Sequence, residues 1–260
     1  NYNNISNSDF SYNNATENAG LFMFQSSYYK VSNSQFNYNY VNASSNILGG
    51  GIIGLYIESN YSEFYNISTR FNEVKTSGSN DIRGGGIIGF YTSSYNIFNL
   101  TNISDSKINS ADRISGGGSF GLYFYSLNNQ IIHVTIANNN VTANGSIYGG
   151  GDLGLSYYSS NNQITRVTIT NNNVSSNENI SGGGSLGVNT DLNYSLSNNI
   201  SQINISENYI YANNIIGGSL GFFGINSLFI NSTIISNNSI FSNNDLAGGS
   251  LGLINTNSAN

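Results

Sequence analysis

The chain has 260 residues, of which 38% are hydrophobic and only 8% charged, a balance that favours a folded core over a disordered segment. The formal net charge of -6, with seven basic residues in all, argues against a nucleic-acid partner, which needs clustered Lys and Arg. There is no Cys, so disulfides and thiolate metal sites are excluded.

A glycine-rich block recurs along the chain. A degenerate copy, NAGLFMF at 18–24, is followed by LGGGIIGLY at 48–56, RGGGIIGFY at 83–91, SGGGSFGLY at 115–123, YGGGDLGLS at 148–156 and SGGGSLGVN at 181–189. The last glycines of the blocks recur at intervals of 31 to 35 residues: Gly54, Gly89, Gly121, Gly154, Gly187, Gly221 and Gly252. A repeat of this length is typical of a solenoid.

Within each block, apolar residues stand directly before and after the last glycine, as Leu186 and Val188 do around Gly187. This period of two predicts a strand with one buried face, so the last glycine points outward. Because glycine weakens a strand, we expect this column to be a packing face that another backbone approaches closely, from a second solenoid or from a layer folded back from the same chain. The alternative is that the glycines serve only a backbone corner with positive φ.

A second signature precedes most blocks: an aromatic residue or Ile followed three positions later by Asn. It predicts an asparagine ladder, in which stacked side-chain amides are hydrogen-bonded from rung to rung. The expected ladder residues are Asn13, Asn39, Asn139, Asn172, Asn208 and Asn238, with Val74 and Ser106 as exceptions. Two positions further on we expect a buried column of Ala15, Val41, Thr76, Ile108, Val141, Val174, Ile210 and Ile240.

Together these patterns give each repeat about three short strands that can bury their apolar faces only by stacking. The sequence therefore predicts an all-β fold, a right-handed parallel β-helix (a single-stranded solenoid) of about eight rungs of 30–36 residues. One domain covers 1–260. Neither end shows a polar cap, so we expect this domain to be a segment of a longer solenoid or to stack end to end. The apolar run 215–230 is interrupted by glycines, which argues against a transmembrane segment.

The chain contains sixteen N-x-S/T sequons, which are candidate glycosylation sites in a secreted eukaryotic or archaeal protein. They are Asn4, Asn14, Asn42, Asn60, Asn66, Asn99, Asn102, Asn140, Asn144, Asn173, Asn179, Asn193, Asn199, Asn204, Asn231 and Asn237. An Asn- and Ser-rich composition also produces sequons by chance. Asn140 and Asn173 directly follow ladder residues, so alternation places them on the outside, about 5 Å apart, where two glycans would crowd each other.

The acidic residues are scattered, whereas acid/base catalysis needs converging carboxylates. Asn189-Thr190-Asp191 resembles the N-T-D element of polygalacturonases, but the other elements of that family are absent. We interpret His133 as an ordinary strand residue, and Asp152, the one acid in a glycine block, has no partners for a calcium site. We thus expect no catalytic, cofactor or metal site. A pectinase-like, carbohydrate-active enzyme is the alternative, and carboxylates from separate rungs on one exposed face would support it.

One segment resembles a known repeat. Phe36-Asn37-Tyr38-Asn39 followed by GGGIIGLY is similar to the F-x-x-N and G-G-A-I pattern of polymorphic outer-membrane proteins. The resemblance extends over all eight rungs, although Phe is in register only at Phe10 and Phe36 and the block reads GGGxxG. It implies a surface-exposed, often adhesive solenoid. We accordingly expect a non-enzymatic extracellular or cell-surface protein that is structural or adhesive, glycosylated, and self-associates into a fibre or layer or binds other surface proteins or glycans.

Overall fold

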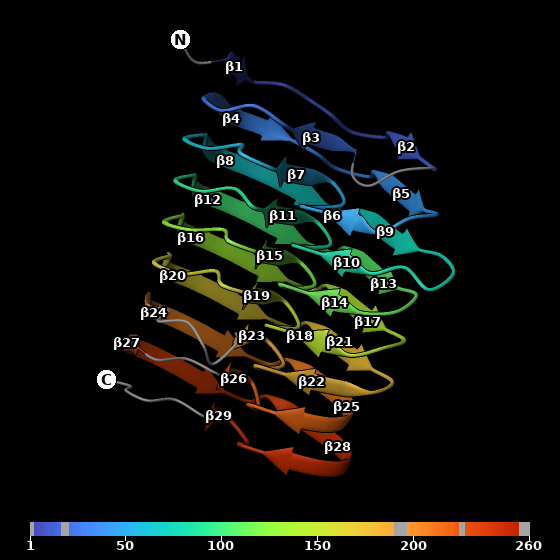
Figure 1. The fold of residues 1–260 in the computed structure, drawn as a ribbon, viewed down its shortest axis with the longest axis vertical. Helices are drawn as coiled ribbons and strands as arrows, with labels where there is room; N and C mark the ends of the chain where they lie inside the picture. The colour runs from blue at the N-terminus through green and yellow to red at the C-terminus, as the bar shows by residue number, and fades with distance from the viewer. Residues whose placement is uncertain (1–2, 17–20, 190–196, 224–226, 255–260) are drawn as a thin grey trace.

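The computed structural model describes residues 3–16, 21–189, 197–223 and 227–254 (Figure 1). In this part of the chain all regular structure is β, and the strands form three parallel sheets that wrap around a common interior. Sheets A and C each contain eight strands in sequential rungs. The predicted parallel β-helix is therefore confirmed.

The strands of each sheet follow one another at one rung per repeat. Sheet A contains β1 (Asn3–Ser6), β4 (Tyr29–Gln35), β8 (Glu63–Arg70), β12 (Ile97–Ser104), β16 (Gln130–Ala137), β20 (Gln163–Thr170), β24 (Ser197–Ser206) and β27 (Ser227–Ser236). Sheet C contains β3 (Phe22–Phe24), β7 (Ile53–Tyr56), β11 (Ile88–Tyr91), β15 (Phe120–Tyr123), β19 (Leu153–Ser156), β23 (Leu186–Asn189), β26 (Leu220–Phe223) and β29 (Leu251–Ile254).

Sheet B has two arms separated by a corner. The first arm contains β2 (Asn14–Ala15), β5 (Tyr40–Ala43), β9 (Glu73–Thr76), β13 (Lys107–Ser110), β17 (Asn140–Ala143) and β21 (Asn173–Ser176). The second contains β6 (Ile47–Leu48), β10 (Ile82–Arg83), β14 (Ile114–Ser115), β18 (Ile147–Tyr148) and β22 (Asn179–Ser181). The long strand β25 (Tyr209–Ile216) joins the arms and pairs with β28 (Ser239–Ala247).

The pairing register places equivalent repeat positions in contact. Gly121 pairs with Gly89 on one side and Gly154 on the other, and the apolar residues that flank each last glycine are buried from β7 to β26. One predicted position is wrong. In the third rung Val74, not Thr76, pairs with Val41 and Ile108. The ladder residue of that rung is Asn72, and the position three residues before it, which pairs with Ile103, is Thr69 and not the aromatic Phe71.

Asparagines form a continuous ladder at the corner between sheets A and B. The backbone N–H of Asn139 donates to Asn172 Oδ1 at 2.8 Å, and Asn139 Nδ2 donates to the carbonyl oxygen of Ile103 at 3.2 Å. Equivalent bonds connect Asn13, Asn39, Asn72, Ser106, Asn139, Asn172, Asn208 and Asn238 in rung order. The side chains thus supply the rung-to-rung bonds where the backbone turns away from its ladder.

A second ladder at the corner between sheets C and A was missed by the sequence analysis. It runs through Ser62, Asn96, Asn129, Asn162 and Asn198, and each backbone N–H donates to the side-chain oxygen of the next rung. These Asn side chains are buried. The signal was present, because in both ladders the Asn stands two positions before a buried apolar strand residue.

The outward-facing glycines do not form an exposed packing face for a second solenoid, because a layer from the same chain covers them. Each glycine triplet folds the chain back over the outer side of the following strand, with its first glycine at positive φ, for example 110° at Gly84. A Cβ on Gly121 would overlap the carbonyl oxygen of Gly84 in the preceding rung. The same close approach buries Gly89, Gly154, Gly187 and Gly221 under glycine triplets, Gly252 under the glycine pair that begins at Gly217, and Gly54 under Met23. Period-two alternation predicts the direction in which a residue points but not what covers that residue. Of the two backbones that the sequence analysis considered, the one that covers the glycines is the layer from the same chain.

Candidate functional site: the aromatic face and the charged edge

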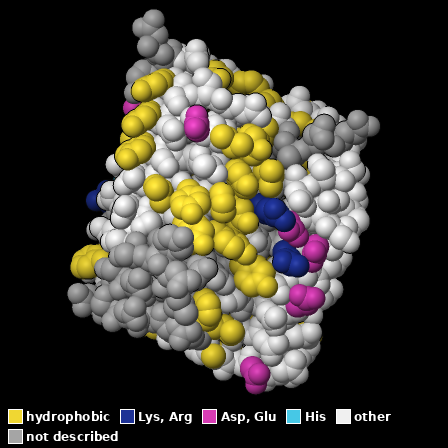
Figure 2. Space-filling view, in the orientation of Figure 1, with side chains coloured by type: hydrophobic (Ala, Val, Ile, Leu, Met, Phe, Trp, Pro, Cys, Tyr) yellow, Lys and Arg dark blue, Asp and Glu magenta, His cyan; other side chains and the backbone are white. Residues whose placement is uncertain are grey.

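Aromatic side chains gather on the outer side of sheet C. Tyr56, Tyr91 and Tyr123 end three successive strands, and their ring centroids lie 5.5 and 5.6 Å apart. The cluster continues into the turns that follow β15 and β19 through Tyr123 and Tyr157, with centroids 5.1 Å apart. We call this set the aromatic face: Tyr56, Tyr91, Tyr123, Phe124, Tyr125, Tyr157 and Tyr158. In Figure 2 a band of hydrophobic side chains crosses the middle of this side of the molecule.

Four aromatic-face residues occupy an unusual backbone conformation. Phe124 and Tyr125 have φ of 51° and 56°, and Tyr157 and Tyr158 have φ of 49° and 57°. This left-handed conformation costs a bulky residue roughly 1–2 kcal/mol, whereas Gly or Asn adopts it readily. Stacking of Tyr125 on Tyr158, at 4.8 Å between centroids, returns about 0.5–1.5 kcal/mol. The turns therefore hold large rings at positions where smaller residues would fit with less strain.

A charged edge lies beside the aromatic face and consists of Asp81, Arg83, Asp112 and Arg113. Arg83 Nη2 donates to Asp81 Oδ2 at 2.8 Å. Burial opposes the charge of Arg83, but the bond to Asp81 and the field of Tyr123 and Tyr91 raise its pKa. Burial likewise raises the pKa of the Tyr123 hydroxyl, with Arg83 opposing that shift. Arg83 thus lies between the charged edge and the aromatic rings.

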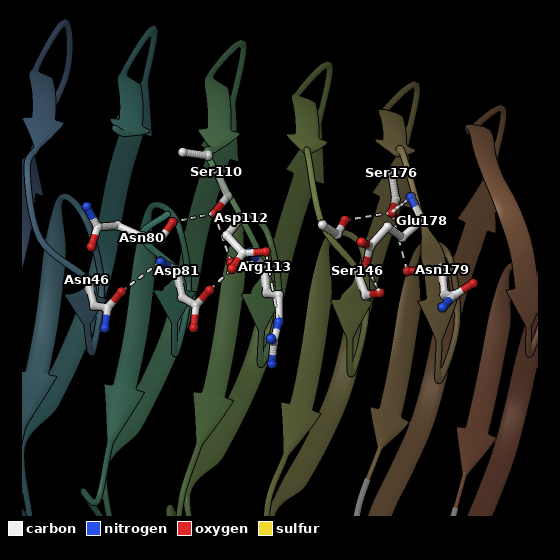
Figure 3. Close-up of polar contacts among 12 residues, drawn as sticks. Asn46, Asn80, Asp81, Ser110, Asp112, Arg113, Ser146, Ser176, Glu178 and Asn179 are labelled. Atoms are coloured by element: carbon white, nitrogen blue, oxygen red, sulfur yellow. Dashed lines mark hydrogen bonds and ion pairs between the residues drawn. The ribbon is translucent and has the colours of Figure 1, made fainter. Parts of the chain in front are cut away.

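The charged edge is built on the corner between the two arms of sheet B (Figure 3). The backbone N–H of Asp81 donates to Asn46 Oδ1 at 2.8 Å, and the backbone N–H of Arg113 donates to Asp81 Oδ1 at 3.1 Å. Asp112 Oδ1 lies 3.9 Å from Arg113 Nε. Both oxygens of Asp81 are therefore engaged, and its carboxylate serves to order the corner and to hold Arg83.

Glu178 lies on the same corner, further along the solenoid. Its Oε2 accepts a hydrogen bond from Ser146 Oγ at 2.9 Å, and its backbone N–H donates to Ser176 Oγ (Figure 3). Carboxylates from separate rungs do share one corner, but the contacts seen for Asp81, Asp112 and Glu178 are to Arg, Ser and backbone groups. Over the described residues, no three His, Asp or Glu side chains are grouped to hold a metal ion. The corner is thus better suited to ionic and hydrogen-bonded contact than to proton transfer.

The sequon asparagines are all at the surface where the structure describes them. Exposed are Asn4, Asn14, Asn66, Asn140, Asn144, Asn173, Asn199, Asn204, Asn231 and Asn237, and half-buried are Asn42, Asn60, Asn99, Asn102 and Asn179. Asn193 lies outside the described residues. Asn140 and Asn173 are paired across adjacent strands, and Asn173 Nδ2 lies 3.4 Å from Asn140 Oδ1, so the expected crowding has a geometric basis.

The remaining sequence candidates do not converge on one site. His133 is exposed on sheet A, where its Nδ1 lies 3.1 Å from Asn99 Oδ1 and its Nε2 lies 3.0 Å from Arg166 Nη1. Thr190 and Asp191 of the N-T-D tripeptide lie outside the described residues, and Asn189 donates from Nδ2 to Ser181 Oγ at 2.9 Å. Asp152 is fully buried. None of these residues therefore adds to the aromatic face or to the charged edge.

Comparisons of the chain with protein-family models, with curated proteins and with solved structures give no significant match. The described residues include no helix that is long and apolar enough to span a membrane. The likeness to polymorphic outer-membrane protein repeats stays a prediction from the quoted motifs.

Proposed function

We propose that this chain is a non-enzymatic, extracellular or cell-surface β-solenoid that acts as a structural and adhesive module. The supporting observation is the aromatic face, which extends over four rungs beside the charged edge. Interface cores are enriched in Tyr, Phe and Arg, and such residues carry most of the binding free energy. Tyr125 and Tyr157 are 39% and 43% exposed, so part of each ring is accessible to a partner.

The aromatic face is distinguished by the arrangement of its rings and not by its backbone, because Tyr28, Tyr61 and Tyr95 have the same left-handed φ, of 67°, 57° and 61°. Aromatic rings also stack elsewhere, as Tyr28, Tyr61 and Tyr95 do with centroids 5.4 and 5.0 Å apart. Rings stacked face to face along the solenoid leave mainly their edges exposed. In the aromatic face, tilted and T-shaped pairs such as Tyr123 with Tyr157 occur beside stacked pairs such as Tyr125 with Tyr158, which leaves a broader and less regular aromatic surface.

Self-association is the contact that we propose for this face. The test is the double variant Tyr125→Ser and Tyr157→Ser, with Tyr65→Ser as the matched control, since Tyr65 is 46% exposed on sheet A. Sedimentation velocity over a concentration series should show association weakened at least tenfold in the double variant and unchanged in the control. Unchanged association in a double variant with native circular dichroism would remove the aromatic face from the proposal.

We also propose N-linked glycans on several exposed sequons. Support comes from the surface position of all fifteen described sequon asparagines. Glycopeptide mapping of natively produced protein should find sugar at Asn140 or Asn173, with incomplete occupancy because the two side chains are in contact. If every sequon is bare, the bacterial adhesin interpretation replaces the glycoprotein one.

A second candidate, a pectinase-like enzyme, is favoured by one observation: Asp81, Asp112 and Glu178 share the corner of sheet B. Its test is release of reducing ends from polygalacturonate, comparing the native chain with Asp112→Asn and Glu178→Gln. If the chain is adhesive and not enzymatic, we expect no release of reducing ends above that of a buffer control. Release that both substitutions abolish would establish the enzyme instead.

A further inference from the structure

In six rungs, the residue that follows the run of two or three glycines belongs to a buried column of mixed character. Its members in rung order are Ile52, Ile87, Ser119, Asp152, Ser185 and Ser219, all with no exposed area. Backbone hydrogen bonds fix the order: the N–H of Ser119 donates to the carbonyl oxygen of Asp152 at 2.9 Å, and the N–H of Asp152 to that of Ser185 at 3.0 Å. Ile52 and Ile87 belong to the hydrophobic core, so the column changes from apolar to polar along the solenoid.

The polar half of this column is not satisfied by other groups. Both carboxyl oxygens of Asp152 and the Oγ atoms of Ser119, Ser185 and Ser219 are buried without a hydrogen-bond partner. Buried polar groups normally have partners, and an isolated buried carboxylate is far more costly than a neutral acid. The absence of partners therefore favours the neutral, protonated form of the Asp152 carboxyl group.

Within the part of the chain that the structure describes, no charged group compensates a negative charge on Asp152. Burial raises the pKa of its carboxyl group well above the ordinary value, and the nearby Ser119 hydroxyl, which is not placed for a full hydrogen bond, opposes that shift without cancelling it. Among the described residues, the one other Asp, Glu, Lys or Arg that is buried is Asp81, which is paired with Arg83 on the charged edge. The neighbours above and below Asp152 are both serines, which carry no charge.

We propose that Asp152 is an internal proton switch: a neutral carboxylic acid, bonded to the adjacent serines, that makes the folded solenoid more stable in mild acid than at higher pH. In the neutral acid the carboxyl O–H donates to one serine Oγ, and the hydroxyl of the other serine donates to the carboxyl C=O. Adjacent rungs are about 4.8 Å apart, which is within reach of these side chains after rotation. Loss of the proton leaves a buried anion with two hydroxyl donors and no cation.

The direction of the pH dependence follows from proton binding. Because the folded chain holds this proton more tightly than the unfolded chain, the folded state binds more protons and its stability falls as pH rises. The stabilisation is complete below the unfolded value near pH 4 and is lost as pH rises through the folded value. Asp105 contributes a pH dependence of the opposite sign. Burial raises its pKa, but hydrogen bonds from Ser104, Asn138 and Arg70 outweigh burial and lower it. Protonation of Asp105 therefore destabilises the folded chain only in stronger acid.

The test compares the native chain with Asp152→Ser, the residue that the column itself uses at three rungs, and with Asp152→Asn, which keeps the side chain's size. Thermal melting between about pH 4 and pH 8 should show the native Tm falling by roughly 5 °C or more, while both variants lose this fall. Asp112→Ser, on the exposed corner, is the control and should keep the native slope. An unchanged slope in a folded Asp152 variant would overturn the proposal.

Infrared spectroscopy gives a readout that packing alone would not move. At about pH 6, where ordinary carboxyl groups are ionised, the native chain should retain the C=O stretch of a protonated carboxylic acid. The band should be absent from Asp152→Ser and Asp152→Asn. If neither variant folds, the native chain alone decides: no such band at about pH 6, or one that Asp152 isotope editing does not shift, contradicts the switch.

Discussion

Leu220 and Leu251 occupy the same position in adjacent rungs, yet Leu220 is 1% exposed and Leu251 is 47% exposed. The difference is the neighbour: β26 is covered by β23 and β29, whereas β29 is paired on one side only in the described chain (Figure 1). Burial in this fold is therefore supplied by the next rung and not by the residue's own rung. Stability then depends on nearest-neighbour contacts, as in other repeat proteins.

A charged residue at an inward-facing position should give the largest difference in unfolding free energy between a middle rung and the last rung. Leu186→Asp would bury an unpaired carboxylate between two rungs and should destabilise the fold by about 4 kcal/mol or more. Leu251→Asp places the same group where water reaches it and should cost under about 1 kcal/mol. Urea unfolding followed by circular dichroism measures both. Equal losses would show that the two leucines do not differ in burial.

A backbone clash should have the next largest effect. Gly121→Ala drives a methyl group into the carbonyl oxygen of Gly84, and rungs held by ladders on both sides cannot separate locally, so we expect a loss of about 3 kcal/mol. Gly249→Ala is the matched control, because a Cβ there meets nothing within 4 Å. Thermal melting should separate the two variants clearly. A Gly121→Ala variant as stable as the control would mean that the triplet does not cover this strand tightly.

Stacking of identical positions explains how much of the fold could be predicted from the sequence. Each inward residue meets its own repeat equivalent, so a one-dimensional pattern such as that around Gly187 translates directly into a buried column. The cover over Gly121 could not be predicted, because it depends on how the Gly84 turn of the preceding rung folds back. That is a spatial offset between rungs, and period-two alternation carries no information about it.

The candidate site was predictable only in part. Tyr56, Tyr91 and Tyr123 follow from alternation, since they stand two positions after the last glycine. Phe124 and Tyr157 lie in left-handed turns, where neither alternation nor turn propensity favours an aromatic residue. The charged edge depends on the corner of sheet B, which brings residues about one repeat apart into contact. These parts of the site arise from turns, whose geometry is less regular than that of the strands.

Substitution of the ladder asparagines should cause the smallest loss of stability among these variants, and it compares a buried ladder residue with a half-buried one. Asn139 Oδ1 accepts from the backbone N–H of Ser106 at 3.0 Å inside the solenoid, so Asn139→Ala leaves a buried donor unpaired and should cost about 2 kcal/mol. Asn238 makes the equivalent bond to the N–H of Asn208 at 2.9 Å but is half-buried. Water can replace that bond, so Asn238→Ala should cost about 1 kcal/mol or less. Urea unfolding of both variants, with hydrogen exchange at the Ser106 and Asn208 amides, measures the difference. Exchange at Ser106 should accelerate in Asn139→Ala, and protection that persists there would show that the ladder side chain is not what holds that amide.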